Sequence, residues 1–265
     1  MSRTRGTWNT TGTWIAGVAL AAVLALTGYA VFGGDDGDTD QAGKGGASAS
    51  ASGSAGPKPG YTPPDDWSEP DRWTALPDGE RTDEHGSEVG FPHTAEGAVA
   101  MAAAANTTSI EGSRNSVDEQ LRLYHSYVAK ADRNDENAEE IELAAIQTDK
   151  SLHQEMGVEV GVPLPSGAYV RSTVIGYKVV HRSENEIAAW LLFRTAQKAG
   201  EMEKESIDYG RILNAVVWED GDWKLSGAAT QRALQGLREG QEPKMVAPGD
   251  ADFNASGWTA VREAS

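Results

Sequence analysis

Four side chains in the middle of the chain are of types that could perform acid–base chemistry. Tyr124 and His125 are neighbours, and Asp208 and Arg211 lie three residues apart in a later segment. An imidazole or a carboxylate can exchange a proton near neutral pH, and a guanidinium can stabilise a developing negative charge. A catalytic centre built from these groups requires that they face one cavity.

The local sequence patterns do not bring the four groups together. In a helix, Tyr124 shares a face with Val128, whereas His125 is turned about 100° away from it. In a strand, Asp208 and Arg211 point to opposite faces, and one cavity could receive both only if a bulge intervened. We therefore expect no catalytic residue, and an acid–base pocket is the alternative.

Two acidic segments begin like calcium-binding loops but lack the residues that complete one. In the segment Asp132–Glu136, the required glycine is replaced by Asn137, and Leu143 stands where a bidentate glutamate belongs. The segment Asp250–Asn254 fails at the same two positions. The other histidines show no ligand spacing: His85, His93, His153 and His181. We expect no metal and no cofactor, and we interpret the acidic residues as helix starts or solvated surface.

The composition disfavours several other functions. The chain has 23 basic and 40 acidic residues and a formal net charge of −17 at pH 7. Nucleic acids and anionic lipids are themselves negative, so binding to either through a broad charged surface is disfavoured. The chain contains no cysteine, which excludes thiolate metal sites, cysteine nucleophiles and disulfides. An exported domain of this chain must therefore be stabilised by its own hydrophobic core.

The segment Trp14–Phe32 contains nineteen residues and no charge. A helix of this length spans roughly 28 Å, close to the hydrocarbon thickness of a bilayer. Arg3 and Arg5 precede the segment, and four aspartates follow it closely. Because basic flanks stay in the cytoplasm, we expect residues 1–13 to be a cytoplasmic stub and residues 14–32 to be a single transmembrane helix. The main domain would then lie outside the cell membrane.

A cleaved signal peptide is the alternative for this segment, because Gly28–Ala30 offers the small-x-small pattern of a cleavage site. The apolar run is longer than the usual core of a signal peptide, which favours a retained anchor. Gly17, Ala21 and Ala25 form a ridge of small residues through which two such helices could pack. We favour the general abundance of Ala and Gly as the explanation of this ridge, and a homo-oligomer formed through it is the alternative.

Two segments of different composition follow the apolar run. Residues 33–60 consist largely of Gly, Ala, Ser and Asp, which predicts a disordered tether. Residues 61–92 carry several prolines together with Trp67 and Trp73, which predicts an extended docking segment. The two tryptophans are the candidate partner-contact residues. Their docking site is either the protein's own domain or a groove on a partner.

Residues 93–230 are long enough to form one domain with a core of its own. Three helices are predicted at its start. Thr94 is the expected N-cap of the first, Ser116–Glu119 reads as a capping box for the second, and the third begins near Asn137. The expected buried side of the third helix consists of Ile141, Ala145, Thr148 and Leu152.

The second half of this region has a hydrophobic period of 2, which predicts strands. The predicted strands are Ala168–His181, Glu186–Ala196, Ser206–Trp218 and Trp223–Leu225. Asp220 and Gly221 form a two-residue hairpin turn. Helices followed by an antiparallel meander predict an α+β domain. We expect residues 231–265 to be a short helix and a loosely attached tail, pinned to the domain by Phe253 and Trp258.

Three helices and a curved antiparallel sheet ending in V-W-E-D-G-D-W-K-L (Val217–Leu225) resemble the NTF2-like fold. This resemblance implies a cone-shaped sheet wrapped on a long helix. The layout also resembles the membrane-anchored NTF2-like proteins of actinobacterial integrative and conjugative elements. The segment Gly90–Ala100 and the pair Gly257-Trp258 correspond to motifs of that group. The VirB8-type assembly factor of type IV secretion systems, a single-span NTF2-like protein, has a similar layout.

The resemblance implies a non-enzymatic, membrane-anchored, extracytoplasmic interaction module that serves a conjugation or type IV secretion-like apparatus as an accessory or assembly component. Its partners would be protein components of a membrane-associated transfer complex, with no direct nucleic-acid contact. The alternative is an exported NTF2-like domain whose cone binds a small ligand or catalyses a reaction. A sensor of the cell envelope is a third interpretation, and the sequence does not separate it from the first.

Overall fold

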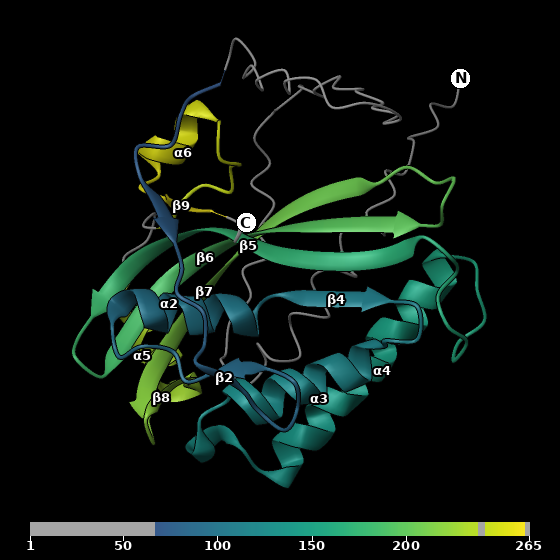
Figure 1. The fold of residues 1–265 in the computed structure, drawn as a ribbon, viewed down its shortest axis with the longest axis horizontal. Coiled ribbons are helices and arrows are strands. Elements are labelled where there is room, and N and C mark those ends of the chain that lie inside the picture. The colour runs from purple at the N-terminus through teal and green to yellow at the C-terminus, as the bar shows by residue number, and fades with distance from the viewer. Residues whose placement is uncertain (1–66, 238–241, 263–265) are drawn as a thin grey trace, which may run out of the picture.

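The computed structural model describes residues 67–237 and 242–262 (Figure 1). The predicted stub, transmembrane helix and tether lie outside these ranges, as do residues 61–66 of the docking segment. Within the described ranges, no helix is long and apolar enough to cross a membrane.

The described chain has an α+β fold around a seven-stranded mixed sheet. The strand order is β1-β9-β5-β6-β7-β8, and β4 also pairs with β5. The prediction of a purely antiparallel sheet is wrong at one edge, because β1 runs parallel to β9. The strands are β1 (Trp73–Ala75), β4 (Thr108–Glu111), β5 (Ala168–Arg182), β6 (Glu186–Ala199), β7 (Ser206–Glu219), β8 (Asp222–Leu225) and β9 (Thr259–Arg262); β2 (Arg81–Thr82) and β3 (Glu88–Val89) form a separate hairpin.

The predicted order of three helices before a four-stranded meander is confirmed, and β4 lies unpredicted between the first two helices. The helices are α2 (Ala95–Ala105), α3 (Ser116–Tyr127), a short 3-10 helix (Lys130–Asp132), α4 (Asp135–Glu155), α5 (Gly227–Gly236) and α6 (Ala251–Ala255). Asp220 and Gly221 have positive φ angles of 52° and 82°, as the predicted hairpin turn between β7 and β8 requires.

Two irregularities in β5 curve the sheet. The register of β5 against β6 shifts between Val174 and Gly176 and again between Val179 and His181. Each bulge bends and twists its strand. β4 pairs with the beginning of β5, and β9 pairs with its middle. The long strands β5, β6 and β7 therefore wrap around a hollow side (Figure 1).

The hollow side of the sheet is filled by α2, which contacts β5, β6, β7 and β8. Seven of the eleven residues of α2 are alanine, and nine of the eleven are buried. Small side chains allow the helix backbone to approach the sheet closely, as dense packing requires. Thr94 caps the helix as predicted, because its Oγ1 accepts a hydrogen bond from Gly97 N at 3.0 Å.

The other two predicted caps are displaced. The N-cap of α3 is Asn115 rather than Ser116, and the N-cap of α4 is Asn134 rather than Asn137. The expected capping box does not form, because Glu119 is buried and bonds to Arg122 instead. An asparagine caps a helix as well as a serine does, so the choice between adjacent candidates follows from packing.

The face of the sheet opposite α2 is covered by α5 and by residues 242–262. Phe253 and Trp258 are 0 % and 1 % exposed, and they pack in one cluster with Trp190 of β6. Trp258 Nε1 donates a hydrogen bond to Lys244 O at 2.8 Å. The sequence predicted a loosely attached tail here. The structure differs, since this segment adds a helix and a strand to the fold.

The backbone of Pro92 lies close to Gly97 in the first turn of α2, and a substitution at Gly97 tests this approach. A Cβ atom on Gly97 would lie 2.0 Å from Pro92 O, which is backbone and cannot move aside cheaply. We predict that Gly97→Ala lowers the free energy of unfolding by about 1–3 kcal/mol, the usual cost of overpacking. Urea denaturation followed by tryptophan fluorescence measures this change.

The matched control is Gly236→Ala at the end of α5, where a Cβ atom meets nothing within 4 Å. This variant should unfold at the same urea concentration as the parent or a higher one, since alanine is the better helix former. Equal stability of the two variants would contradict the close approach of Pro92 to the first turn of α2.

Candidate functional site

Tyr124 and His125 have separate structural surroundings. The Tyr124 hydroxyl accepts a hydrogen bond from Asn134 N at 2.8 Å and donates one to Asn134 O at 2.9 Å. It therefore joins α3 to the start of α4. His125 is exposed and stacks on His85 with ring centroids 5.1 Å apart. Desolvation, followed by the neighbouring His85 and Arg133, lowers the pKa of His125.

Asp208 and Arg211 lie on opposite faces of β7, as their spacing predicted. Asp208 is paired in register with Thr195 of β6. Arg211 lies on the other face, where its Nη1 donates to Pro243 O at 2.6 Å and its second amino group bonds to Glu242. The rings of Tyr124 and His125 contact each other, with centroids 5.2 Å apart. Asp208 and Arg211 lie on opposite faces of β7, so one cavity does not receive all four candidates.

Buried polar groups of the helices and strands bond to one another. Asn106, at the end of α2, donates from Nδ2 to Asn214 Oδ1 of β7 at 2.7 Å. Thr195 Oγ1 donates to Ser172 Oγ at 3.3 Å between β6 and β5. These pairs were not predicted, because their members are far apart in the sequence. They stabilise the packing of the strands and of α2.

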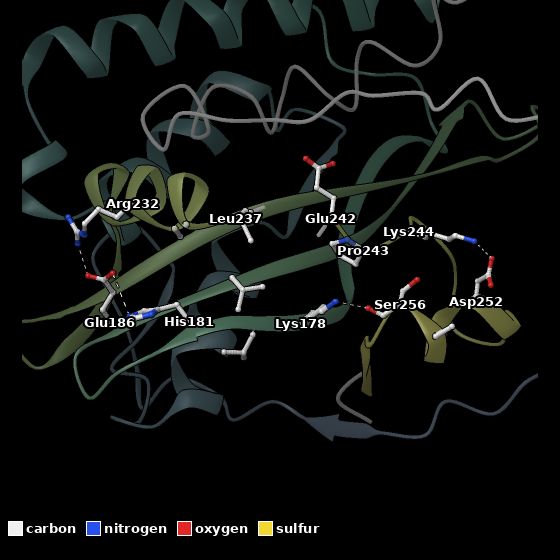
Figure 2. A pocket seen from close by; sticks show the side chains of 15 residues that line it. Lys178, His181, Glu186, Arg232, Leu237, Glu242, Pro243, Lys244, Asp252 and Ser256 are labelled. Atoms are coloured by element: carbon white, nitrogen blue, oxygen red, sulfur yellow. Dashed lines mark hydrogen bonds and ion pairs between the residues drawn. The ribbon is translucent and has the colours of Figure 1, made fainter. Parts of the chain in front are cut away.

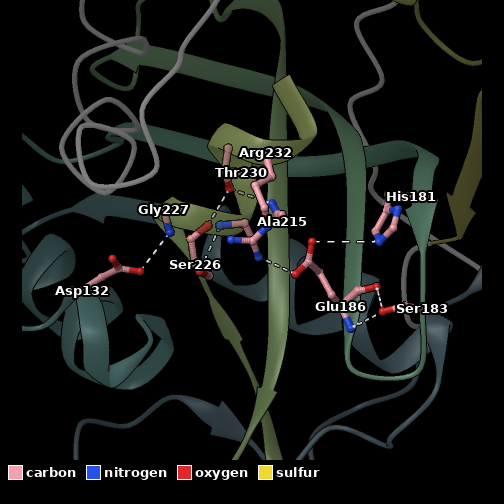
Figure 3. Close-up of polar contacts among 10 residues, drawn as sticks. Asp132, His181, Ser183, Glu186, Ala215, Ser226, Gly227, Thr230 and Arg232 are labelled. Atoms are coloured by element: carbon pink, nitrogen blue, oxygen red, sulfur yellow. Dashed lines mark hydrogen bonds and ion pairs between the residues drawn. The ribbon is translucent and has the colours of Figure 1, made fainter. Parts of the chain in front are cut away.

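The two calcium-like acidic segments serve helix starts. Asp132 Oδ2 accepts a hydrogen bond from Gly227 N at 2.9 Å, at the first turn of α5 (Figure 3). A carboxylate at this position is stabilised by the helix dipole. Asp250 caps α6 by accepting from Asp252 N. Among the described residues, no group of three or more His, Cys, Asp or Glu side chains is placed to hold a metal ion.

The scattered histidines also have structural contacts. His93 stacks on Trp218 with centroids 3.9 Å apart. The His153 ring nitrogens lie 2.7 Å from Asp149 O and 2.8 Å from Val162 O. The ring thus links α4 to the loop that follows it.

Trp67 and Trp73 share one carboxylate. Trp67 Nε1 donates to Glu69 Oε2 at 2.9 Å, and Trp73 Nε1 donates to Glu69 Oε1 at 2.7 Å. These bonds lower the pKa of Glu69, the bond from Trp67 more than the bond from Trp73. We did not predict this clasp, although the spacing W-x-E-x-x-x-W is a sequence signal for it.

Both tryptophans of the clasp lie against the C-terminal segment of the same chain. The Trp67 ring occupies the space that a side chain at Gly249 would need, since a Cβ there would lie 2.2 Å from Trp67 Cζ3. Trp73 begins β1, which pairs with β9, and it packs with Phe253 and Trp258 in the cluster on that face. These contacts support the interpretation that the segment docks on the protein's own domain.

A pocket of about 900 Å³ lies outside the hollow side, between β5, α5 and α6 (Figure 2). Its apolar wall includes Val180, Ala233 and Leu237, which also pack against the cluster around Trp258. Lys178 Nζ at its edge donates to Ser256 O at 2.9 Å. The pocket is therefore an amphipathic cleft on the surface that the C-terminal segment covers.

Several charged groups at the rim of this pocket form ion pairs. Arg232 bonds to Glu186 at 2.6 Å, and His181 lies 4.0 Å from the same carboxylate (Figures 2 and 3). Lys244 bonds to Asp252 at 2.7 Å, which raises the pKa of Lys244. Exposed charge pairs of this kind contribute little stability.

The α+β domain thus has a filled hollow side and surface features on its edges and outer face. A family model with the description "Domain of unknown function (DUF8175)" matches residues 38–241. This match covers most of the chain, so the protein belongs to that family. The matched range ends before α6 and β9. Comparisons with curated proteins and with solved structures gave no match.

The clasp predicts a response to acid. The pKa of Glu69 in the folded protein lies below its ordinary value of 4.5. Its stabilising contribution is therefore complete above that value and is lost as the pH falls through the lowered pKa. We predict that Glu69→Ala lowers the protection factors of the amides in residues 67–75 at neutral pH. Acidification through the lowered pKa should lower the same protection factors in the parent protein, after each rate is divided by the intrinsic exchange rate at that pH.

The matched control is Asp71→Ala, which removes a neighbouring exposed carboxylate that lies outside the clasp. Hydrogen exchange with mass spectrometry of peptides from this segment measures both variants. Equal exchange in the Glu69→Ala and Asp71→Ala proteins would show that the clasp does not hold the segment.

Proposed function

We propose that this protein is a non-enzymatic, membrane-anchored, extracytoplasmic interaction module with an NTF2-like fold. We propose further that it is an accessory or assembly component of a conjugation or type IV secretion-like apparatus. The observation that carries this proposal is the filling of the hollow side by α2, with nine of its eleven residues buried. An interior occupied by a helix directs function to the outer surfaces.

The NTF2-like assignment is supported by the order and placement of the elements. Three helices precede a curved meander, and the first of these helices lies in the hollow of the sheet. The hairpin that ends the meander, Val217–Leu225, buries Trp223 and Leu225 against α2 and its neighbours. Fold alone does not assign a role, since NTF2-like domains include enzymes and scaffolds.

The membrane-anchored arrangement is supported by the sequence of residues 14–32 and by the basic residues before them. The partners are protein components of a membrane-associated transfer complex. The net charge of −17 disfavours direct nucleic-acid binding. A homo-oligomer formed through the small-residue ridge of the apolar segment is part of the same proposal.

A ligand-binding role is the second candidate, and the outer pocket is the observation that favours it. Its volume of about 900 Å³ is within the range of small-molecule sites. Its apolar wall and paired rim suit an amphipathic ligand better than a reactive one. The ligand would then bind beside α5 and α6 rather than inside the hollow of the sheet.

Photo-crosslinking in intact cells tests the proposed function. A photoreactive phenylalanine analogue is introduced separately at Tyr209 on β7, at Ile146 on α4 and at His181 in the outer pocket, all of which are exposed. We predict that irradiation joins at least one of these positions to a transfer ATPase, a channel subunit or a cell-wall hydrolase. Cells that are not irradiated serve as the control.

Recovery of the protein alone from all three positions would contradict the interaction module. A thermal-shift screen of the purified protein would then test the ligand-binding role, since a ligand at 100 times its dissociation constant stabilises a protein by about 2.7 kcal/mol.

A further inference from the structure

β7 is paired along its length on one side only. β6 pairs with it as far back as Ser206, whereas β8 reaches back only to Val216. The start of α5 provides hydrogen-bond partners for one further residue of β7, Ala215. Ser226 N donates to Ala215 O at 3.0 Å, and Ala215 N donates to Thr230 Oγ1 at 2.9 Å (Figure 3). The outer edge of β7 before Ala215 has no strand beside it in the described part of the chain.

The direction of the backbone groups along β7 follows from its hairpin. Glu219 and Asp222 flank a two-residue turn, so they form a hydrogen-bonded pair. Hydrogen-bonded positions alternate along an antiparallel strand, which directs the odd-numbered residues of β7 away from β6. Trp218 N donates toward the β6 side, to Asn185 O at 2.9 Å, as this alternation requires.

Three consecutive odd-numbered residues present their N–H and C=O groups at the outer edge: Ile207, Tyr209 and Arg211. The backbone hydrogen bonds of the described residues include none on this side for these three. Ile207 is 44 % exposed and Tyr209 is 42 % exposed. The edge ends at Leu213, whose carbonyl accepts from Asn214 Nδ2 at 3.2 Å. An edge of this kind is a template for an added strand.

The side chains along this edge alternate in character. Ile207 and Tyr209 lie on the outer face, and Asp208 lies between them on the hollow side, in register with Thr195. Asp208 forms no ion pair with another residue in the described ranges. An incoming strand would therefore meet an apolar surface at one set of alternate positions and a carboxylate at the other.

The charge of the protein selects between possible occupants of this edge. A second copy would pair antiparallel about Tyr209 and place the two Asp208 side chains diagonally across one face. It would also bring two chains of net charge −17 together. The negative potential of the protein attracts a partner that carries basic residues. The occupant that fits is a cationic strand of another protein.

We propose that the outer edge of β7 from Ile207 to Arg211 binds an extended segment of a partner protein by strand addition. The segment carries apolar residues opposite Ile207 and Tyr209 and a Lys or Arg opposite Asp208. The inference rests on the proposed interaction function and assigns a surface and a partner chemistry to it.

Fluorescence anisotropy of a labelled peptide tests the proposal on the full-length protein purified in detergent. The probe is a peptide of alternating Lys and Val residues, and the comparison peptide has Glu in place of Lys. We expect the Lys–Val peptide to bind at least about tenfold more tightly than the Glu–Val peptide, and to weaken as salt is added. Equal binding of the two peptides overturns the proposal.

Tyr209→Pro tests the role of the backbone. Proline removes the outward N–H of this residue but no hydrogen bond to β6, because the amide points away from that strand. We expect this variant to bind the Lys–Val peptide at least about tenfold more weakly than the parent protein does. The matched control Tyr209→Ala retains the N–H and should bind more tightly than the proline variant. Equal binding by the two variants overturns strand addition.

Asp208→Lys tests the role of the Asp208 carboxylate without altering the backbone. It therefore tests the proposal even if the proline variant does not fold. We expect it to abolish the preference for Lys–Val over Glu–Val. The control is Glu142→Lys, which makes the same charge change at an exposed position of α4 and should keep the preference. Loss of the preference in both variants would assign it to net charge and overturn the proposed site.

The in-cell crosslinks separate failure of this inference from failure of the proposed function. Crosslinks from Ile146 or His181 to transfer proteins that are unchanged when Tyr209→Pro is also present would support the interaction module. That result would also show that the edge of β7 is not its binding surface. Absence of capture from every position contradicts the interaction module itself.

Discussion

The packing of α2 into the hollow of the curved sheet is the interaction on which the rest of the structure depends. The bulges of β5 create the hollow, and a helix made mostly of alanine can enter it closely enough to contact four strands. Close contact of this kind leaves little tolerance for added volume. The segment before the helix is also close to it, since a Cβ atom on Gly97 would lie 2.0 Å from Pro92 O.

The outer face is organised by contacts between the two ends of the described chain. β1 runs parallel to β9, and the Trp67–Glu69–Trp73 clasp rests on the segment around Gly249. The N-terminal docking segment and the C-terminal segment thus stabilise each other. In the proposed arrangement, the first of these segments leads back to the membrane anchor.

The parts of the fold that local patterns determine could be predicted from the sequence. The long strands, the Asp220-Gly221 turn and the Thr94 cap each depend on residues close together in the chain. The parallel β1–β9 pair could not, because its two strands are distant in sequence. The expected pinning of the C-terminal segment by Phe253 and Trp258 is confirmed, but the added helix and strand were not predicted. For the site, parity along β7 correctly separated Asp208 from Arg211. The strand order was needed to identify the edge of β7 that has no neighbouring strand among the described residues.

The most direct test of the account is residue-resolved hydrogen exchange of the protein without any partner. The hydrogen-bonded amides of α2, residues 98–105, should exchange only through global unfolding, with the same protection as the central strands β5 and β6. Exchange of these α2 amides that is much faster than that of β5 and β6 would contradict the account. The hollow side would then open at a lower free energy than global unfolding. We would in that case propose a ligand site within the sheet in place of the outer surfaces.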